Sequence, residues 1–197
     1  VVRIRNTVQS WDLAFKKKRK SDYSVCGTLK TDGYNVYLVD VLHERLTESR
    51  FQAVLADKAE AWRPTKIGIE DTAAQEWVGQ GAQRRHLLPI EGFSVGSTPL
   101  EFRAAFFAQL VQQGRFYADK RAAYWRVMAQ QMQQFPHGAH DDIISMLAQG
   151  CHMLVGRSSA LIRTHRYARQ TTGEVTKISA YRAKHPKPKK TKIQVPA

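Results

Sequence analysis

Apolar residues in the first 45 positions are spaced as in β-strands. Three segments, 7–15, 23–29 and 34–42, are rich in β-branched and aromatic residues, and polar stretches separate them. Asp32-Gly33 lies between the second and third segments and is typical of a β-hairpin turn. The run from Tyr34 to Val41 is almost continuously apolar, as expected of an interior strand. The pattern therefore predicts three consecutive strands, of which the last two form a hairpin.

Beyond the hairpin the apolar spacing becomes helical. Phe51, Leu55 and Trp62 recur at helical intervals, Thr47 suits the start of this helix, and Pro64 follows its end. The other elements that we predict are a strand over 66–70, a helix over 73–78, a strand over 86–90, a helix over 102–111, an extended stretch over 115–118, and helices over 122–134 and 141–154. Three strands followed by strands with helical crossovers predict an α/β fold with a mixed central sheet of about five or more strands, flanked by helices. This is the element order of an RNase H-like fold of the RuvC type.

Charge divides the chain into two parts. Lys and Arg number 31 against 17 Asp and Glu, which gives a net charge of +14 and favours a polyanionic partner such as nucleic acid. Arg157 to Ala197 holds 11 of these cations and one acid, Glu174. We therefore predict a folded domain over residues 1–156 and a basic, partly flexible tail over 157–197.

Several classes of protein fit the sequence poorly. No apolar run is long enough to span a membrane, and the first residues do not follow the pattern of a signal peptide. The two cysteines, Cys26 and Cys151, lie in apolar segments and cannot provide a disulfide framework or a cysteine zinc site. The sequence contains no phosphate-binding loop of the ATPase type, so we expect no ATPase activity from this chain.

Three acidic positions stand out, one inside a predicted strand and two where predicted elements end or begin. Asp12 lies among apolar residues of the first strand, where a carboxylate is disfavoured unless it is paired or binds a metal. Glu70 and Asp71 end the strand over 66–70, at the edge where α/β proteins usually place their sites. Asp141 and Asp142 open the last helix. Each acid also has a structural interpretation, as an ion-pair partner or as a helix cap.

Together, a strand-borne Asp, a strand-end Glu and a helix-start Asp indicate a metal site. Such clusters hold two divalent ions roughly 3.5–4 Å apart, one activating water and the other stabilising the leaving oxygen of a phosphodiester. Oxygen ligands favour Mg²⁺ or Mn²⁺ over zinc. The expected chemistry is hydrolysis of a nucleic acid backbone.

Four blocks of sequence resemble, in the same order, the nuclease motifs of phage large terminases. The resemblance covers about residues 7 to 155. The blocks are Ser10-Trp11-Asp12-Leu13-Ala14-Phe15 followed by Ser21-Asp22-Tyr23-Ser24, Tyr37-Leu38-Val39-Asp40-Val41, Ile67-Gly68-Ile69-Glu70-Asp71, and Phe135-Pro136-His137-Gly138-Ala139-His140-Asp141-Asp142. Arg103 and Gly114-Arg115-Phe116-Tyr117 resemble later features of the family, although the Asp-Lys pair that often precedes the matched Arg is missing.

The resemblance implies an RNase H-like endonuclease that cuts concatemeric viral DNA during genome packaging. By motif, Asp12, Glu70 and Asp142 are the catalytic metal ligands, with Asp141 as the alternative third ligand, Asp71 as a weaker alternative to Glu70, and His140 as an accessory residue. The implied partners are double-stranded DNA, the portal, the small terminase subunit and an N-terminal ATPase domain that is not part of this sequence. The implied location is the cytoplasm of the host bacterium, transiently at the procapsid, without membrane attachment.

The basic run Lys16, Lys17, Lys18, Arg19 and Lys20 follows Asp12 by a few residues. We expect this run to contact DNA phosphates without reading sequence, so that binding weakens steeply with salt. Two other functions fit the same observations. One is a nuclease of the same fold that acts on branched DNA or transposon ends. The other is a basic docking domain for DNA or the portal that has no catalytic activity.

Overall fold

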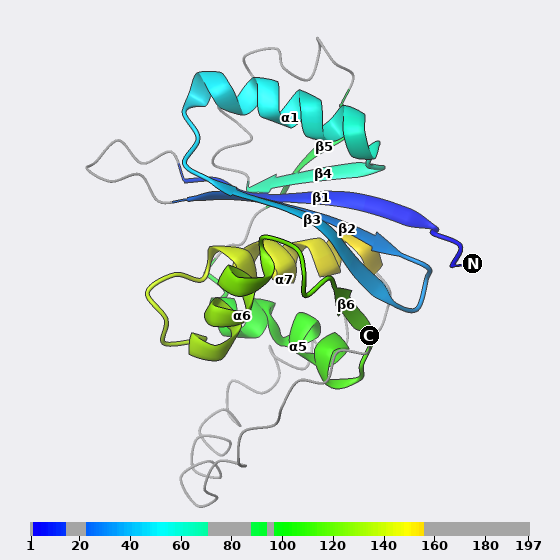
Figure 1. Ribbon diagram of the computed structural model, residues 1–197, viewed down its shortest axis with the longest axis vertical. Helices are drawn as coiled ribbons and strands as arrows, with labels where there is room; N and C mark the ends of the chain where they lie inside the picture. The colour runs from blue at the N-terminus through cyan, green and yellow to red at the C-terminus, as the bar shows by residue number, and fades with distance from the viewer. Residues whose placement is uncertain (1, 15–22, 71–87, 94–96, 156–197) are drawn as a thin grey trace, which may run out of the picture. The chain divides into compact units, whose positions relative to one another are not determined.

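Six strands form one mixed sheet at the centre of the computed structural model, which describes residues 2–14, 23–70, 88–93 and 97–155 (Figure 1). The order across the sheet is β5-β4-β1-β2-β3-β6. The pairs β1–β2 and β2–β3 are antiparallel, and the pairs β1–β4, β4–β5 and β3–β6 are parallel. The strands are β1 (Asn6–Asp12), β2 (Ser24–Thr31), β3 (Val36–Glu44), β4 (Lys66–Glu70), β5 (Ile90–Phe93) and β6 (Phe116–Ala118).

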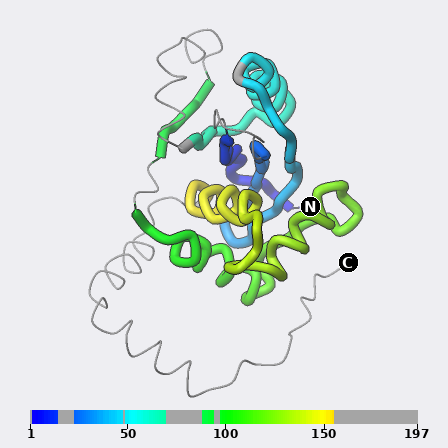
Figure 2. Tube along the Cα trace, turned by 90° about the vertical axis from the view of Figure 1, so that its left-hand side faces the viewer, coloured from blue at the N-terminus to red at the C-terminus, as the bar shows by residue number. Residues whose placement is uncertain are grey.

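Helices cover both faces of this sheet. Helix α1 (Glu48–Trp62) lies on one face, and α5 (Ala105–Gln112), α6 (Trp125–Gln134) and α7 (Asp142–Val155) lie on the other, with the short α4 (Leu100–Arg103) preceding α5. Figure 2 looks onto the end of the sheet and shows α1 and α7 on opposite sides of the strands. The predicted α/β class with a mixed, helix-flanked sheet is confirmed.

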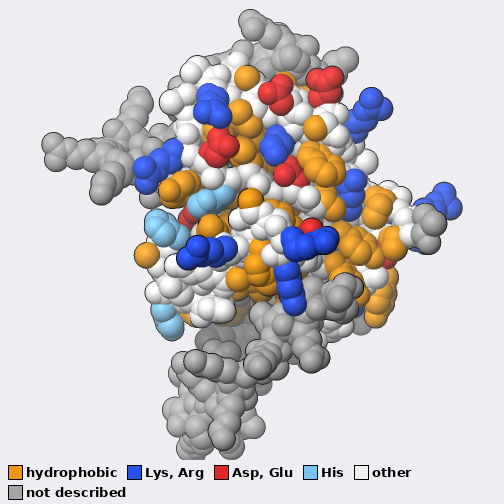
Figure 3. Space-filling model, viewed as in Figure 1, with side chains coloured by type: hydrophobic (Ala, Val, Ile, Leu, Met, Phe, Trp, Pro, Cys, Tyr) orange, Lys and Arg blue, Asp and Glu red, His pale blue; other side chains and the backbone are white. Residues whose placement is uncertain are grey.

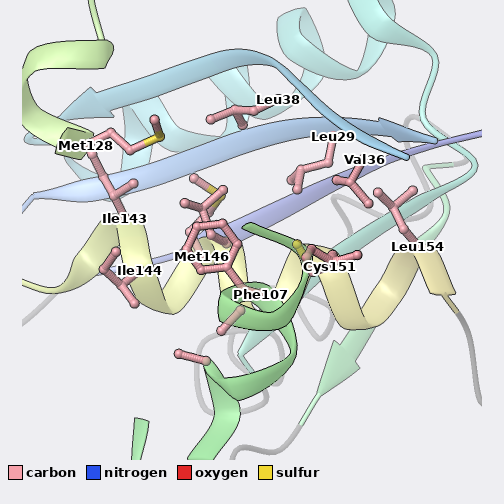
Figure 4. Close-up of a cluster of buried hydrophobic side chains, with 14 of the residues drawn as sticks. Leu29, Val36, Leu38, Phe107, Met128, Ile143, Ile144, Met146, Cys151 and Leu154 are labelled. Atoms are coloured by element: carbon pink, nitrogen blue, oxygen red, sulfur yellow. The ribbon is translucent and has the colours of Figure 1, made fainter. Parts of the chain in front are cut away.

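Each face of the sheet has its own hydrophobic core. The larger core packs α5, α6 and α7 against the strands, and Figure 4 shows its members around Met146 of α7. The smaller core packs α1, where Trp11 is fully buried and meets Phe51 edge to face, with ring centroids 5.2 Å apart. Two separate cores follow from the sheet, because its two faces each need an apolar cover.

Side chains of β1 alternate between these cores. The Nε2 of Gln9 donates to the main-chain oxygen of Lys58 in α1 at 2.8 Å, and Trp11 joins the α1 core. Val8 belongs to the α7 core, and Ser10 lies against Gly150 of α7. Because successive residues of a strand point to opposite faces, Asp12 belongs to the face that α7 covers.

Glycine lets α7 pack directly on the strands. A Cβ built on Gly150 would lie 2.5 Å from Leu29 Cδ1, closer than real contacts allow, and 3.3 Å from the Cβ of Ser10, a tight contact. A Cβ on Gly27 of β2 would collide with the sulfur of Met146. These contacts fix the position of α7 along the sheet, and with it the position of the first residue of the helix.

Some element boundaries differ from the prediction. Tyr34 lies in the hairpin turn, not in the strand, and its side chain is 65% exposed, because the carboxylate of Asp32 accepts the backbone N–H groups of Tyr34 and Asn35 and extends the turn. Strand β5 is Ile90–Phe93, later than the predicted 86–90. The predicted helix over 102–111 begins earlier, after Pro99, and is interrupted at Ala104. The predicted helix over 73–78 lies outside the described residues.

The structure also bears on the cysteines and on membrane insertion. Cys26 and Cys151 are buried and form no disulfide, as predicted. Among the described residues, no helix is long and apolar enough to cross a membrane.

Candidate metal centre

Asp12 and His43 lie in one row across the carboxyl end of β1. Asp12 pairs with Val25 of β2, and Val25 pairs in turn with His43 of β3. Directly paired residues point to the same face of a sheet. Asp12, Val25 and His43 therefore face α7, and Asp12 is partly buried.

Asp142 reaches this row from the opposite layer. It is the first residue of α7, its side chain is 16% exposed, and its Oδ2 lies 3.4 Å from Nε2 of His43. The next residue, Ile143, donates its backbone N–H to the side-chain oxygen of Gln131 in α6 at 2.9 Å. Gln131 is 4% exposed, so a buried side chain of α6 satisfies one of the free N–H groups at the start of α7. This bond holds the turn that carries Asp142.

Glu70 ends the strand next to β1. Strands β1 and β4 are parallel and pair Trp11 with Ile69, so Asp12 and Glu70 are the next residues along two neighbouring strands. Glu70 itself pairs with Phe93 of β5. The side chain of Glu70 lies outside the described residues. The backbone nevertheless brings Glu70 to the same end of the sheet as Asp12.

Sequence reasoning did not identify His43 or Gln131. His43 occupies its place because β3 has an irregularity opposite Thr28 and Leu29, which pair with Asp40 and Leu38 and leave Val39 without a partner. A regular hairpin counted from its turn would pair Leu42 with Val25 and turn His43 to the other face. The feature that turns His43 towards the site is therefore this β-bulge, which the sequence alone does not reveal. Gln131 is one of several glutamines in α6, and only its burial distinguishes it.

Asp40 belongs to the other face of the sheet. Its Oδ2 accepts from Lys58 Nζ at 2.6 Å and from Trp62 Nε1 at 3.1 Å, both in α1. Both members of the ion pair are 23% exposed. Asp40 is thus a structural acid that ties β3 to α1, although it lies within one of the blocks of sequence quoted above.

Asp141 and Asp142 have different surroundings. The side chain of Asp141 is exposed, and its main-chain oxygen accepts the N–H of Ser145 at 2.8 Å, as at a helix start. His140 is also exposed. Arg103 lies near the other end of α7, where its main-chain oxygen is 3.2 Å from Nε2 of His152. Ten residues of helix, about 15 Å, separate His152 from Asp142, so the fold does not bring Arg103 to the site.

Several predicted residues lie outside the described part of the chain. These are Asp71, the basic run Lys16, Lys17, Lys18, Arg19 and Lys20, and the tail over 157–197. Among the described side chains, no group of three or more His, Cys, Asp and Glu lies close enough to hold a metal ion. Asp12 and Asp142 are two of the three predicted ligands, and the third side chain, Glu70, is not among those described.

The donors that are described suit a hard divalent cation. In the described part of the chain, the carboxylate of the partly buried Asp142 lies beside the imidazole of His43, and no Lys or Arg pairs with it. Oxygen donors at such a position favour Mg²⁺ or Mn²⁺. Figure 3 shows histidine side chains grouped at the left of the molecule, the end of the sheet at which β1 and β3 finish.

Comparison with known proteins identifies the family of the chain and agrees with its fold. The family model described as "Terminase RNaseH-like domain" matches residues 9–154. The search of curated proteins gave no match. Among solved structures, the large terminase nuclease of thermophilic phage G20c with bound magnesium is similar at 18% identity, covering 74% of this chain and 80% of that one, with a TM-score of 0.55. The same nuclease with bound zinc gives 20% identity, 74% and 79% coverage, and a TM-score of 0.54. The human cytomegalovirus terminase nuclease domain is similar at 13% identity, with 74% and 80% coverage and a TM-score of 0.52.

Proposed function

Because the chain belongs to the family of terminase RNaseH-like domains, we propose that it is the nuclease part of a phage large terminase and cuts concatemeric viral DNA during genome packaging. The observation that supports this proposal is the backbone arrangement: Asp12 and Glu70 follow paired residues of two neighbouring parallel strands, and Asp142, at the start of α7, contacts His43 in the row of Asp12. Members of one fold family can differ in activity, so the site and not the fold supports a nuclease.

In this proposal Asp12, Glu70 and Asp142 hold two divalent ions. We propose Mg²⁺ or Mn²⁺ because the ligands are carboxylate oxygens. Solved G20c nuclease structures hold magnesium, zinc or cobalt, and a cytomegalovirus nuclease structure was soaked with manganese. When bound, such ions supply an activated water and stabilise the negative charge on the leaving oxygen. Asp141 is the alternative third ligand, and its exposed side chain favours Asp142 over it.

The protein's own residues would position these groups. Gln131 fixes the first turn of α7 through Ile143, and His43 orients the carboxylate of Asp142. Hydrogen-bond partners of metal ligands set their orientation and often change metal affinity or activity by 10- to 100-fold.

DNA binding would depend on phosphate contacts. The chain has a net charge of +14, and we propose that Lys16 to Lys20 and the basic tail hold the backbone without reading sequence. The portal, the small terminase subunit and an ATPase domain are the further partners that the family suggests, and the setting is the cytoplasm of an infected bacterium.

The proposal is tested by incubating the full chain with supercoiled plasmid, linear duplex and a four-way DNA junction in EDTA, Mg²⁺ or Mn²⁺. We expect metal-dependent cutting of plasmid and linear duplex with little sequence preference. Preferential cutting of the junction would instead support a resolvase. Folded protein that binds DNA but cuts none of these substrates with either metal would support a docking domain.

A further inference from the structure

A second group of side chains extends the site outward along β2 and β3. The ring of Tyr23 stacks on His43, with centroids 4.2 Å apart and an interplanar angle of 13°. The guanidinium carbon of Arg45 lies 4.9 Å from the centroid of the same ring. Asp142, His43, Tyr23 and Arg45 thus form a continuous series of contacts that leads from a proposed metal ligand to an exposed cation.

The sheet explains this arrangement. Val25 pairs with His43 in the antiparallel β2–β3 ladder, so continuing the register places Tyr23 opposite Arg45. Both lie two residues beyond the row of Asp12 and His43, and therefore on the same face. Glu44 lies between His43 and Arg45 along the chain. Its side chain points to the other face and pairs with Arg50 of α1 at 3.2 Å. Two residues of strand place Arg45 about 7 Å beyond that row.

Arg45 has the chemistry of a phosphate contact. Among the described residues it takes part in no ion pair, and its contact is with an aromatic ring, which leaves the guanidinium donors available. Stacking on an aromatic ring limits the motion of a guanidinium without neutralising its charge. A guanidinium can bind two phosphate oxygens at once, which fixes the direction of a nucleic acid backbone.

We propose that Arg45, held by Tyr23, binds a DNA phosphate next to the one that reaches the carboxylates and so sets the register of the backbone at the site. This inference rests on the proposed function for its substrate, double-stranded DNA. It adds a specific contact to the basic run Lys16 to Lys20, whose role was proposed from charge alone.

The test measures equilibrium binding of a fluorescent duplex to the full chain in EDTA over a range of salt concentrations. Arg45→Ala is expected to weaken binding about tenfold. The negative slope of the logarithm of the binding constant against the logarithm of the salt concentration should become shallower by about 0.9, the value for one lost phosphate contact. Arg50→Ala is the matched control, because it removes the same charge from the opposite face and should leave the slope unchanged.

Tyr23 provides an independent readout. Tyr23→Phe keeps the stacking ring and should bind like the unmodified chain, whereas Tyr23→Ala should weaken binding with the salt slope intact. Circular dichroism shows whether each variant is folded. Equal slopes and affinities for Arg45→Ala and Arg50→Ala would overturn the inference while leaving the nuclease proposal in place. If the unmodified chain cuts no DNA with either metal but its binding depends on Arg45, the nuclease proposal is overturned and the present inference stands.

Discussion

The imidazole of His43 lies 3.4 Å from the carboxylate of Asp142, although 99 residues separate them in the sequence. The contact joins the end of β3 to the start of α7, across the face of the sheet that carries Asp12. It therefore connects the two layers of the fold at the point where we place the metal ions.

Removing this imidazole tests whether it orients a metal ligand. His43→Ala is expected to lower the rate of plasmid cleavage by about 10- to 100-fold and to raise the Mn²⁺ concentration that half-maximal cleavage requires, because Asp142 loses its partner. His152→Ala is the control, since His152 is at the other end of α7. Equal cleavage by His43→Ala and the unmodified chain would show that the contact has no catalytic role.

Gln131 should contribute to stability and activity together. Gln131→Leu keeps most of the volume but leaves the N–H of Ile143 without its acceptor, at a cost of about 1–3 kcal/mol in the free energy of unfolding. The start of α7 then loosens and cleavage falls. Gln130→Leu, at an exposed neighbour, should change stability by less than about 0.5 kcal/mol. Urea unfolding of the two variants decides the matter, and equal midpoints would contradict this account of α7.

The turn of the β2–β3 hairpin should respond to acid. Backbone N–H groups of Asn35 and Tyr34 and the hydroxyl of Tyr37 donate to Asp32 and lower its pKa from the ordinary value of 3.8. The folded-state pKa is below the unfolded one, so this stabilisation is complete above about pH 4 and is lost as the pH falls further. Asp32→Asn should lower the Tm at pH 7 and bring the two proteins closer together below pH 4. A difference in Tm that is constant with pH would refute this.

Both thiols should be unreactive in the folded protein. Burial raises the pKa of Cys26 and of Cys151, so almost no thiolate is present near neutral pH. We expect an aromatic disulfide reagent to label neither cysteine at pH 8 in native buffer and to label both in strong denaturant. Rapid labelling of either thiol without denaturant would mean that the core between the sheet and a helix layer opens readily.

The sequence predicted the sheet and its helices well where one pattern dominates. The Asp32-Gly33 hairpin, α1 with Thr47 at its start, and α7 all follow from short-range signals: turn chemistry, capping and helical apolar spacing. Boundaries failed where a side chain overrode the pattern, as Asp32 does when it keeps Tyr34 in the turn despite the apolar run that follows. Strand propensity does not register such a local hydrogen-bond network.

The candidate site was predictable only in part. Asp12 could be proposed because it is a carboxylate among the apolar residues of a predicted strand, and Glu70 and Asp142 because each stands at an element boundary; all three lie in recognisable motifs. His43 could not, because an irregularity around Val39 in β3 decides which face it occupies. Asp40 lies in the same strand but faces α1 and pairs with Lys58. Which residue of a strand reaches a site depends on register, and register is a long-range property.

The central claim is that carboxylates at this end of the sheet bind the ions that cut DNA. Its most direct test is Mn²⁺-dependent plasmid cleavage by Asp12→Asn, Glu70→Gln and Asp142→Asn, beside Asp40→Asn as a strand acid on the opposite face. We predict that each of the first three variants lowers the cleavage rate by at least about 100-fold while remaining folded and binding DNA, because each would remove a proposed metal ligand. Asp40→Asn should cut like the unmodified chain. Cleavage that persists in the first three variants, or that is lost equally in all four, would contradict the assignment of the metal centre.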